Sequence, residues 1–264
     1  MSVALLKDLH LLTRDGQLNA DARRKLKQIR HLVGLLKPAF DDALARQTEP
    51  IVIDCGAGKS YLGALIYELV LGPAGRGSII AIEARPELSE QAAARAARFG
   101  QERFRVATGE IDKIEIAERP NVVTALHACD TATDDAIVLA IAKNADHIAV
   151  VPCCQAEVAR QLESSKPDDP VLAALFAHPI HRRELGSHLT NVIRSLVLEA
   201  HGYKVMVTEL VGWEHSAKNE LILAKRVNRF DAAARAQLRA TLTSFKVEPT
   251  LIRELARRDL DPRA

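Results

Sequence analysis

Residues 51–62 read IVIDCGAGKSYL and contain the first groups in this chain whose spacing suggests chemistry. A short apolar run ends in Asp54, and Gly56, Gly58 and Lys59 follow within five residues. Glycine-rich loops of this kind wrap the phosphates of a nucleotide or hold another cofactor against the start of a helix. The positions of the glycines distinguish between these two functions.

The spacing argues against a nucleotide-binding loop. A phosphate loop reads Gly-x-x-x-x-Gly-Lys-Ser/Thr, and counting back from Gly58, Lys59 and Ser60 places its first glycine at Ile53. That residue lies inside the apolar run. The dinucleotide motif Gly-x-Gly-x-x-Gly fails at its third position, which is Tyr61. Both motifs are therefore disfavoured.

The pattern Asp-x-Gly-x-Gly at the end of a first strand is instead typical of a loop that holds S-adenosylmethionine. Gly56 and Gly58 let the backbone approach a cofactor without interference from a Cβ atom. A helix that starts near Lys59 and Ser60 favours the methionine carboxylate, and Asp54 can accept hydrogen bonds from loop amides and from the methionine ammonium. The alternative is an ordinary strand–helix turn that happens to contain two glycines.

Acids follow the next two expected strands. Glu83 ends SIIAIE (78–83), and an acid at this position can bind both ribose hydroxyls of a nucleoside cofactor. After the third strand, Glu110 or Asp112 in ATGEID can accept the adenine amino group. The alternative for all three is a solvated surface acid.

The fourth and fifth strands are followed by a second set of reactive side chains. HACD supplies His127, Cys129 and Asp130, and VPCCQ supplies Cys153 and Cys154. In an open parallel sheet the ligand crevice lies outside the carboxyl ends of the strands, so these groups are expected to converge there. Alternatively, Asp130 caps the next helix and the cysteines are small buried hydrophobes. Adjacent cysteines lack the usual spacing of a zinc site, so we expect no metal.

The elements that must position these groups alternate regularly along the chain. Short β-branched runs alternate with Ala-rich helical stretches, which predicts a parallel sheet covered on both faces. The expected strands are 51–54, 78–83, 104–107, 122–126, 147–152, 203–211 and 220–227, and the helices between them include 60–71, 86–99 and 134–143. The last two strands form a terminal antiparallel hairpin. The predicted fold is α/β and Rossmann-like, with six parallel strands and one antiparallel strand in a seven-stranded sheet.

Additional helices flank this sheet at both ends. We expect a helical extension over 1–48, a catalytic domain over 49–228 with an insertion at 156–190 that forms the substrate rim, and C-terminal helices over 229–264. Residues 1–48 carry nine Lys/Arg and five Asp/Glu, and the helix 21–36 holds most of this excess. A solvated helix face explains these charges, and a surface that contacts RNA phosphates is the alternative.

Composition limits the class of protein. The 264 residues are 48% hydrophobic and 27% charged, as in ordinary globular proteins, and the formal net charge of +2 does not by itself indicate a nucleic-acid partner. No run of about 18 apolar residues predicts a membrane span. Four cysteines, two of them adjacent, do not form a disulfide framework, so we expect a cytoplasmic protein with free thiols.

Four ordered segments together resemble a family of S-adenosylmethionine-dependent methyltransferases: DCGAGKSYL, HACDTATDDAI, VPCCQ and EHSAKNELI. The family includes the methyltransferase domain of glutathione-S-transferase C-terminal-domain-containing proteins and, more distantly, tRNA ribose 2′-O-methyltransferases. The resemblance spans roughly residues 25–227. It departs at Ser60 and at Asp130, where relatives usually carry glycine, so the helix start is expected to differ and the role of Asp130 is in question.

The resemblance implies class I methyl transfer from S-adenosylmethionine to an acceptor, with RNA favoured over protein or a small molecule. His127 and Asp130 are the nearest candidate bases by sequence, and Cys153 and Cys154 are expected to shape the acceptor pocket. Two other classes stay open: a non-catalytic module that binds the cofactor, and a thiol-dependent enzyme that uses the cysteine pair.

Overall fold

The structure, a computed structural model, describes residues 3–9, 12, 20–126, 128, 131–152, 156–165, 169–210 and 220–263. Side chains at 20–22 and 24–30 are not described. The predicted residues His127, Cys129, Asp130, Cys153 and Cys154 therefore lie outside the described residues.

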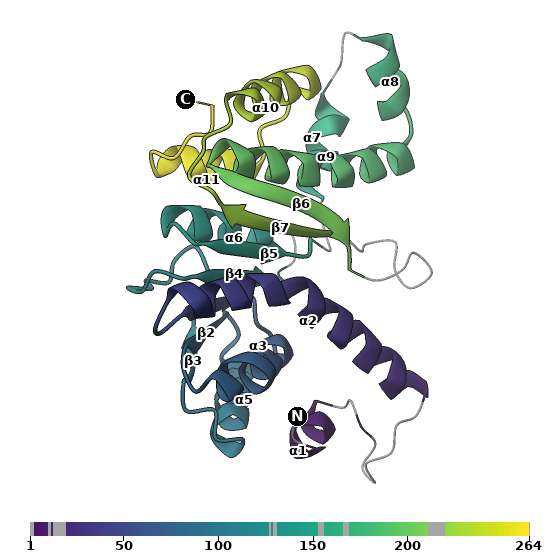
Figure 1. The fold of residues 1–264 in the computed structure, drawn as a ribbon. Coiled ribbons are helices and arrows are strands. Elements are labelled where there is room, and N and C mark those ends of the chain that lie inside the picture. Colours follow the sequence, from purple (N-terminus) through teal and green to yellow (C-terminus); the bar gives the residue numbers. More distant parts are fainter. Residues whose placement is uncertain are drawn as a thin grey trace.

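One seven-stranded sheet organises the chain (Figure 1). Its strands are β1 (Ile51–Cys55), β2 (Ser78–Glu83), β3 (Phe104–Thr108), β4 (Val122–Ala125), β5 (His147–Val150), β6 (Tyr203–Glu209) and β7 (Glu220–Arg226). The order across the sheet is β3-β2-β1-β4-β5-β7-β6. Only β7 runs against its neighbours, β5 and β6, which confirms the predicted fold class and the terminal hairpin.

The sheet reverses its direction of growth between β1 and β4. From β1 the chain proceeds outward to β2 and β3, and it then returns to pair β4 with the other side of β1. Such a switch point separates the loops that follow the two central strands and leaves a crevice at their carboxyl ends. The loops after β1 and β4 are among those in which the sequence predicted binding groups.

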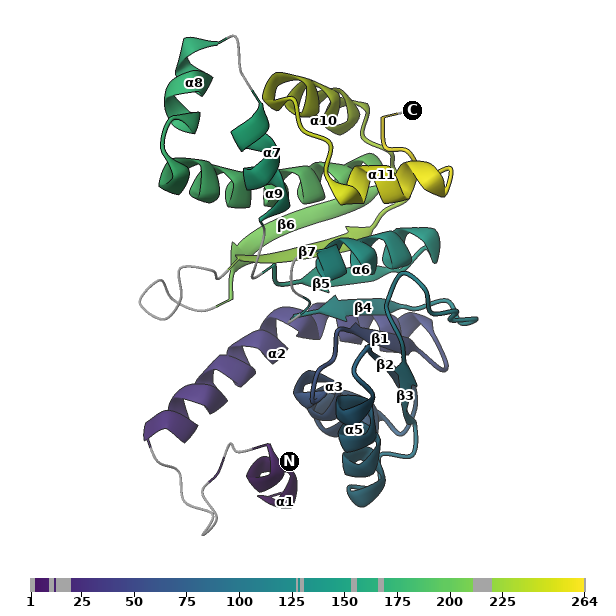
Figure 2. The same cartoon turned by 180° about the vertical axis from the view of Figure 1, so that it is seen from behind.

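Helices cover both faces of the sheet (Figures 1 and 2). The first face carries α2 (Ala20–Arg46), α3 (Tyr61–Ile66) with its π-helical continuation Tyr67–Leu71 and the short α4 (Gly72–Ala74), and α5 (Pro86–Arg98). The second face carries α6 (Thr131–Ala142), α7 (Glu157–Ser164), α8 (Pro170–Phe176), α9 (Pro179–Ala200), α10 (Ala232–Phe245) and α11 (Thr250–Arg257). The first helix, α1 (Val3–Asp8), lies beside α3 and α5. In the described part of the chain, no helix has both the length and the apolar character of a membrane span.

Alternating side chains on the central strands divide the core into two layers. Ile53 belongs to the cluster beneath α6 and α9, whereas its neighbour Val52 packs with Leu36 and Phe40 of α2. All four side chains are almost fully buried. The period of two along a strand buried on both faces explains why apolar runs, and not alternating patterns, marked the strands.

The insertion 156–190 is mostly helical and is fixed to the C-terminal helices. It forms α7, α8 and the first half of α9, and α7 packs against α9. Glu157 accepts hydrogen bonds from the Thr250 amide (2.9 Å) and from Arg253 Nη2 (2.9 Å) of α11. Farther along, Arg194 of α9 forms a buried 2.7 Å ion pair with Asp134 of α6. The insertion is therefore held against the second face of the sheet through α9 and α11.

Two segments extend past the sheet on the side of the carboxyl ends of its parallel strands. These are the N-terminal half of α2 and the unit formed by α8 and the start of α9, both on the right in Figure 1 and on the left in Figure 2. They come from opposite faces of the sheet. The edge that holds the predicted site is thus flanked by one segment from each face.

Candidate cofactor site

The loop after β1 has a backbone conformation that glycine adopts readily. Gly56 and Gly58 adopt φ values of 63° and 57°, in the left-handed region that disfavours a side chain. A Cβ atom at Gly56 would lie 3.1 Å from the Cβ of Ala128, so the loop closely approaches the segment that follows β4. Together with Asp54, Tyr61 and neighbouring residues, the loop lines a cavity of about 260 Å³.

Ser60 shows why the relatives implied by the resemblance carry glycine. It also adopts a left-handed conformation, with φ 51°, immediately before α3 begins at Tyr61. A non-glycine residue in this region costs on the order of 1–2 kcal/mol. Its Oγ is buried and, among the described residues, has no hydrogen-bond partner. Serine is thus accommodated with strain, and α3 starts one residue later than the predicted Ser60.

Asp54 is a buried carboxyl group at the switch point. Its exposed fraction is 3%, and Thr124 Oγ1 of β4 donates a 2.8 Å hydrogen bond to its Oδ1. Its Oδ2 has no partner in the described part of the chain. Burial raises the pKa of Asp54 to about 7, because the hydrogen bonds from Thr124 and from the Gly63 backbone offset desolvation only in part. This group can therefore hold or release a proton near neutral pH.

Glu83 supports the glycine loop directly. Its Oε2 accepts a 2.6 Å hydrogen bond from the Gly58 amide, and its Oε1 accepts a 2.7 Å bond from Arg85 Nε. The residue is 4% exposed. Burial opposes its charge, but the hydrogen bonds from Arg85 and Gly58 outweigh that penalty and lower the pKa of Glu83. The carboxylate is therefore ionised at neutral pH and lies against the loop.

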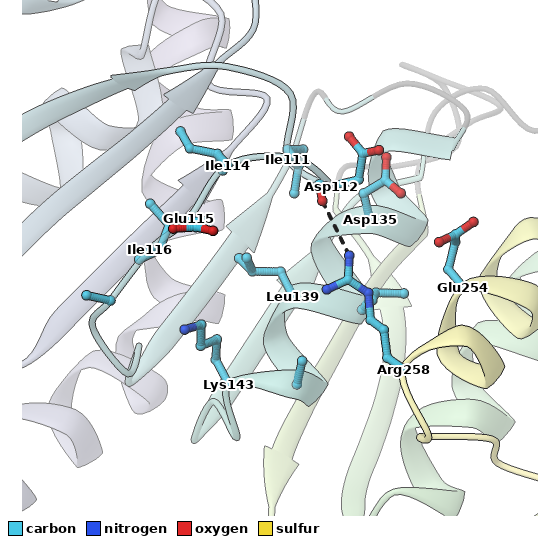
Figure 3. Close-up of a pocket in the computed structure, with 13 residues that line it drawn as sticks. Ile111, Asp112, Ile114, Glu115, Ile116, Asp135, Leu139, Lys143, Glu254 and Arg258 are labelled. Carbon is cyan, nitrogen blue, oxygen red and sulfur yellow. Dashed lines mark hydrogen bonds between the residues drawn. The ribbon is translucent and has the colours of Figure 1, made fainter.

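The two acids expected at the adenine are not brought to the loop. Glu110 is exposed and pairs with Lys113 at 2.5 Å. Asp112 is also exposed and lines a different cavity of about 490 Å³, between the segment 111–117, α6 and α11 (Figure 3). Neither residue lines the cavity formed by the glycine loop.

The second cavity gathers acids around an arginine. Figure 3 shows Asp112 beside Asp135, with Glu254 facing them from α11. Arg258 Nη2 donates a 3.3 Å hydrogen bond to the Asp112 carbonyl. Burial and the nearby charges of Asp112, Asp134 and Glu254 raise the pKa of Asp135 to about 7. The arginine thus partly neutralises a cluster of like charges outside the glycine loop.

The candidate catalytic residues belong to segments whose preceding strands are adjacent. Ala125 at the end of β4 pairs with Val150 near the end of β5. His127 and Asp130 follow the first strand in sequence, and Cys153 and Cys154 follow the second, but all four lie outside the described residues. Their roles remain predictions. Among the described residues the free thiol of Cys55 is buried, and burial together with the charge of Asp54 raises its pKa, which makes it a poor nucleophile.

Three supporting residues were missed in the sequence. Thr124 was visible as a single polar residue in the apolar run VVTAL, and a buried polar group in a strand needs a partner. Arg85 follows Glu83 by two residues and offered a weak local signal. Arg95, which donates a hydrogen bond to the Lys59 carbonyl, lies 36 residues away and offered none.

Comparison with known proteins identifies the family. Residues 24–161, more than half of the chain, match the family described as a methyltransferase domain, and the chain belongs to this family. It is a methyltransferase, and its methyl donor is S-adenosylmethionine. No curated protein matches the chain in sequence.

Solved methyltransferase structures resemble the chain at low identity. An rRNA methylase from Streptococcus thermophilus is 12% identical, with 72% of this chain and 92% of that chain covered and a TM-score of 0.44. Magnesium protoporphyrin IX methyltransferase from Synechocystis with bound SAH is also 12% identical, with coverage of 85% and 95% and a TM-score of 0.47.

The residues after β1 and β2 fit this cofactor. The left-handed glycines leave room for a ligand at the loop backbone, and the buried, unpartnered Oδ2 of Asp54 matches a cationic group such as an ammonium. Glu83 is ionised and offers carboxylate oxygens of the kind that bind ribose hydroxyls. The cofactor would supply an electrophilic methyl group, while these residues would hold its methionine and ribose moieties. In that arrangement the carboxylate of Glu83 would accept hydrogen bonds from both Arg85 and the ribose hydroxyls.

Gly58→Val is expected to abolish binding of S-adenosylhomocysteine, the demethylated product, measured by calorimetry. Valine would be strained at φ 57°, and its Cβ would lie 4.0 Å from Arg85 Nη2, on the side where Glu83 approaches. Gly75→Val is the matched control, because Gly75 has a φ of 68° and no atom lies within 4 Å of an added Cβ. Equal loss of binding in both variants would mean that backbone strain, and not the site, is responsible.

Glu83→Gln is expected to weaken cofactor binding by roughly tenfold to a hundredfold. The change keeps the shape of the side chain but removes the charge, and charge-assisted hydrogen bonds contribute about 1.5–3 kcal/mol. Glu87→Gln, at an exposed residue in the first turn of α5, serves as the control. Unchanged affinity in the Glu83 variant would show that this carboxylate supports the loop without contacting the ribose.

Cofactor affinity is expected to rise about tenfold between about pH 6 and about pH 8. Asp54, with a pKa of about 7, is protonated below this range and attracts the methionine ammonium only after losing its proton. The lowered pKa of Glu83 keeps that group ionised throughout. Calorimetry with Asp54→Asn should give weaker binding without this slope; a slope that persists in the variant would assign it to another group.

Proposed function

We propose that this methyltransferase acts on RNA. The observation that carries the proposal is the course of α2, whose N-terminal half extends past the sheet at the edge that holds the glycine loop (Figure 1). The sequence places five basic residues in this half: Arg23, Arg24, Lys25, Lys27 and Arg30. A projecting basic helix beside a methyl-donor site is suited to the phosphate backbone of a nucleic acid.

The opposite side of the same edge offers further groups for an anionic partner. His178, His181, Arg183 and His188 are exposed around the start of α9. The rings of His178 and His181 make an edge-to-face contact with centroids 5.2 Å apart. In this proposal the insertion 156–190 and the basic helix 21–36 of the extension 1–48 recognise the acceptor, residues 49–228 carry the transfer, and 229–264 support the insertion.

The chemistry would take place between the segments that follow β4 and β5. Methyl transfer is an in-line displacement, so holding the acceptor atom at near-attack distance supplies much of the acceleration. We assign the general base to His127 or Asp130 and the walls of the acceptor pocket to Cys153 and Cys154. The resemblance to tRNA ribose 2′-O-methyltransferases and to the methyltransferase domain of glutathione-S-transferase C-terminal-domain-containing proteins supports these assignments except that of Asp130, where relatives usually carry glycine.

Incubation with S-adenosylmethionine labelled on its methyl group is expected to label RNA, and not protein or small metabolites, in a mixed extract. Digestion of the labelled RNA to nucleosides would identify the acceptor atom. Label that is found only in protein or metabolites would refute the RNA proposal. Cofactor binding without transfer to any fraction would favour a non-catalytic module.

Arg23→Ala/Lys27→Ala is expected to lower the rate of RNA methylation about tenfold at subsaturating RNA and to reduce the salt dependence of binding by about two counterions. Lys37→Ala/Arg46→Ala is the matched control, since it removes two charges from the same helix. Those charges lie in its C-terminal half and pair with Asp41 and Asp42. Equal effects of both double variants would mean that net charge, and not the projecting half of α2, attracts the RNA.

A further inference from the structure

The first helix of the chain packs directly behind the glycine loop. Leu5, Leu6 and Leu9 are at most 9% exposed and contact Leu65 of α3, with Tyr61 at the edge of the same cluster. Figure 2 shows α1 beside α3 and α5, on the far side of those helices from the sheet. This small cluster is separate from the two layers of the main core.

Asp8 at the end of α1 connects this helix to two arginines of α5. Its Oδ2 accepts a 2.5 Å hydrogen bond from Arg95 Nε, and its Oδ1 lies 2.7 Å from Arg98 Nη2. The side chain of Arg95 is 9% exposed, whereas that of Arg98 is 60% exposed. Because charged hydrogen bonds strengthen where water is excluded, the pair with Arg95 is expected to dominate.

Arg95 extends from this ion pair to the loop. Its Nη1 donates a hydrogen bond to the carbonyl of Lys59, and its guanidinium lies over the ring of Tyr61, 5.1 Å from the centroid. Lys59 and Tyr61 both line the 260 Å³ cavity of the candidate cofactor site. A continuous set of contacts thus runs from Asp8 through Arg95 to the wall of that cavity.

The point of attachment is a strained part of the loop. The carbonyl of Lys59 belongs to the peptide that precedes Ser60, whose left-handed backbone is unfavourable for serine. A hydrogen bond to this carbonyl restrains the peptide, and the arginine–ring contact restrains the first residue of α3. On the other side, Glu83 holds the loop through the Gly58 amide.

We propose that α1 is a clamp on the cofactor loop, with Asp8 and Arg95 as positioning residues, and that docking of α1 and cofactor binding stabilise each other. The proposal rests on the proposed role of this loop in holding S-adenosylmethionine. Such coupling is reciprocal: if the docked helix favours the bound loop, the ligand must favour the docked helix by the same factor.

Calorimetry with S-adenosylhomocysteine tests the clamp in the full chain. Asp8→Asn is expected to weaken binding about tenfold, because it removes the charge that orients Arg95, and Asp8→Glu should restore part of the affinity. Arg98→Ala is the matched control: it removes the other partner of Asp8, for which no contact with the loop is described, and should change affinity less than twofold. Arg95→Lys keeps a charge but cannot bridge both partners and should behave like Asp8→Asn.

Hydrogen exchange provides the readout that general destabilisation would not reproduce. In the wild-type protein, S-adenosylhomocysteine should slow exchange in residues 3–9 as well as in 57–62, and in Asp8→Asn the ligand should protect 57–62 alone. Absence of binding to the wild-type protein would refute the proposed role of the loop. Normal affinity in the Asp8 and Arg95 variants, or no ligand-dependent protection of 3–9 in a wild-type protein that binds, would refute the clamp.

Discussion

The hydrogen bond from the Gly58 amide to Glu83 is the contact on which the candidate site depends. This 2.6 Å hydrogen bond joins the loop after β1 to the last residue of β2, at the carboxyl ends of two neighbouring parallel strands. A loop with left-handed backbone at the alternate positions 56, 58 and 60 cannot form the regular hydrogen bonds of a helix or strand. Besides the backbone hydrogen bonds of Ala57 to Ile82 and of Ser60 to Ala57, two side chains hold the loop: Glu83 accepts from the Gly58 amide, and Arg95 donates to the Lys59 carbonyl. The parallel sheet is therefore a scaffold that fixes the distance between these partners.

The two carboxylates of this site differ because their surroundings differ. Asp54 is enclosed by the sheet, and burial outweighs the hydrogen bonds from Thr124 and from the Gly63 backbone, so its pKa is raised to about 7. Glu83 is equally covered, yet it accepts from two backbone amides and an arginine, and these bonds lower its pKa. Environments that separate the pKa values of nearby acids commonly assign them different roles. Here one acid is a permanent anion that also supports the loop, and the other changes charge near neutral pH.

The sequence predicted the elements better than it predicted the contacts of the site. All seven strands were anticipated. The central strands β1, β2, β4 and β5 are buried on both faces and therefore appear as continuous apolar runs, whereas the edge strands β3 and β6 are more exposed and were marked by their β-branched residues. Asp54, Gly56, Gly58 and Glu83 could be proposed as cofactor residues because each lies at or just after a strand end with a recognisable local pattern. A position after a strand does not by itself place a residue at the glycine loop. Asp112 also follows a strand, but it lies in the non-helical segment 109–121 between β3 and β4 and lines another cavity. The link from Asp8 to Arg95 spans 87 residues, and nothing in either local sequence indicates it.

The segment that precedes β1 supplies structure to both sides of the proposed reaction. Its first helix, α1, contacts the wall of the cofactor cavity through Arg95, and its second helix, α2, packs on the sheet with its C-terminal half and projects with its N-terminal half.

Helices that only cover a sheet bury one face along their whole length. The projection of α2 past the sheet edge is not explained by that role, and neither is the hydrogen bond from Arg95 to a loop carbonyl. Both features follow if residues 1–48 evolved with the site: one helix restrains the loop that holds the donor, and the other extends toward the acceptor. Under that interpretation the two helices are parts of one substrate-binding extension.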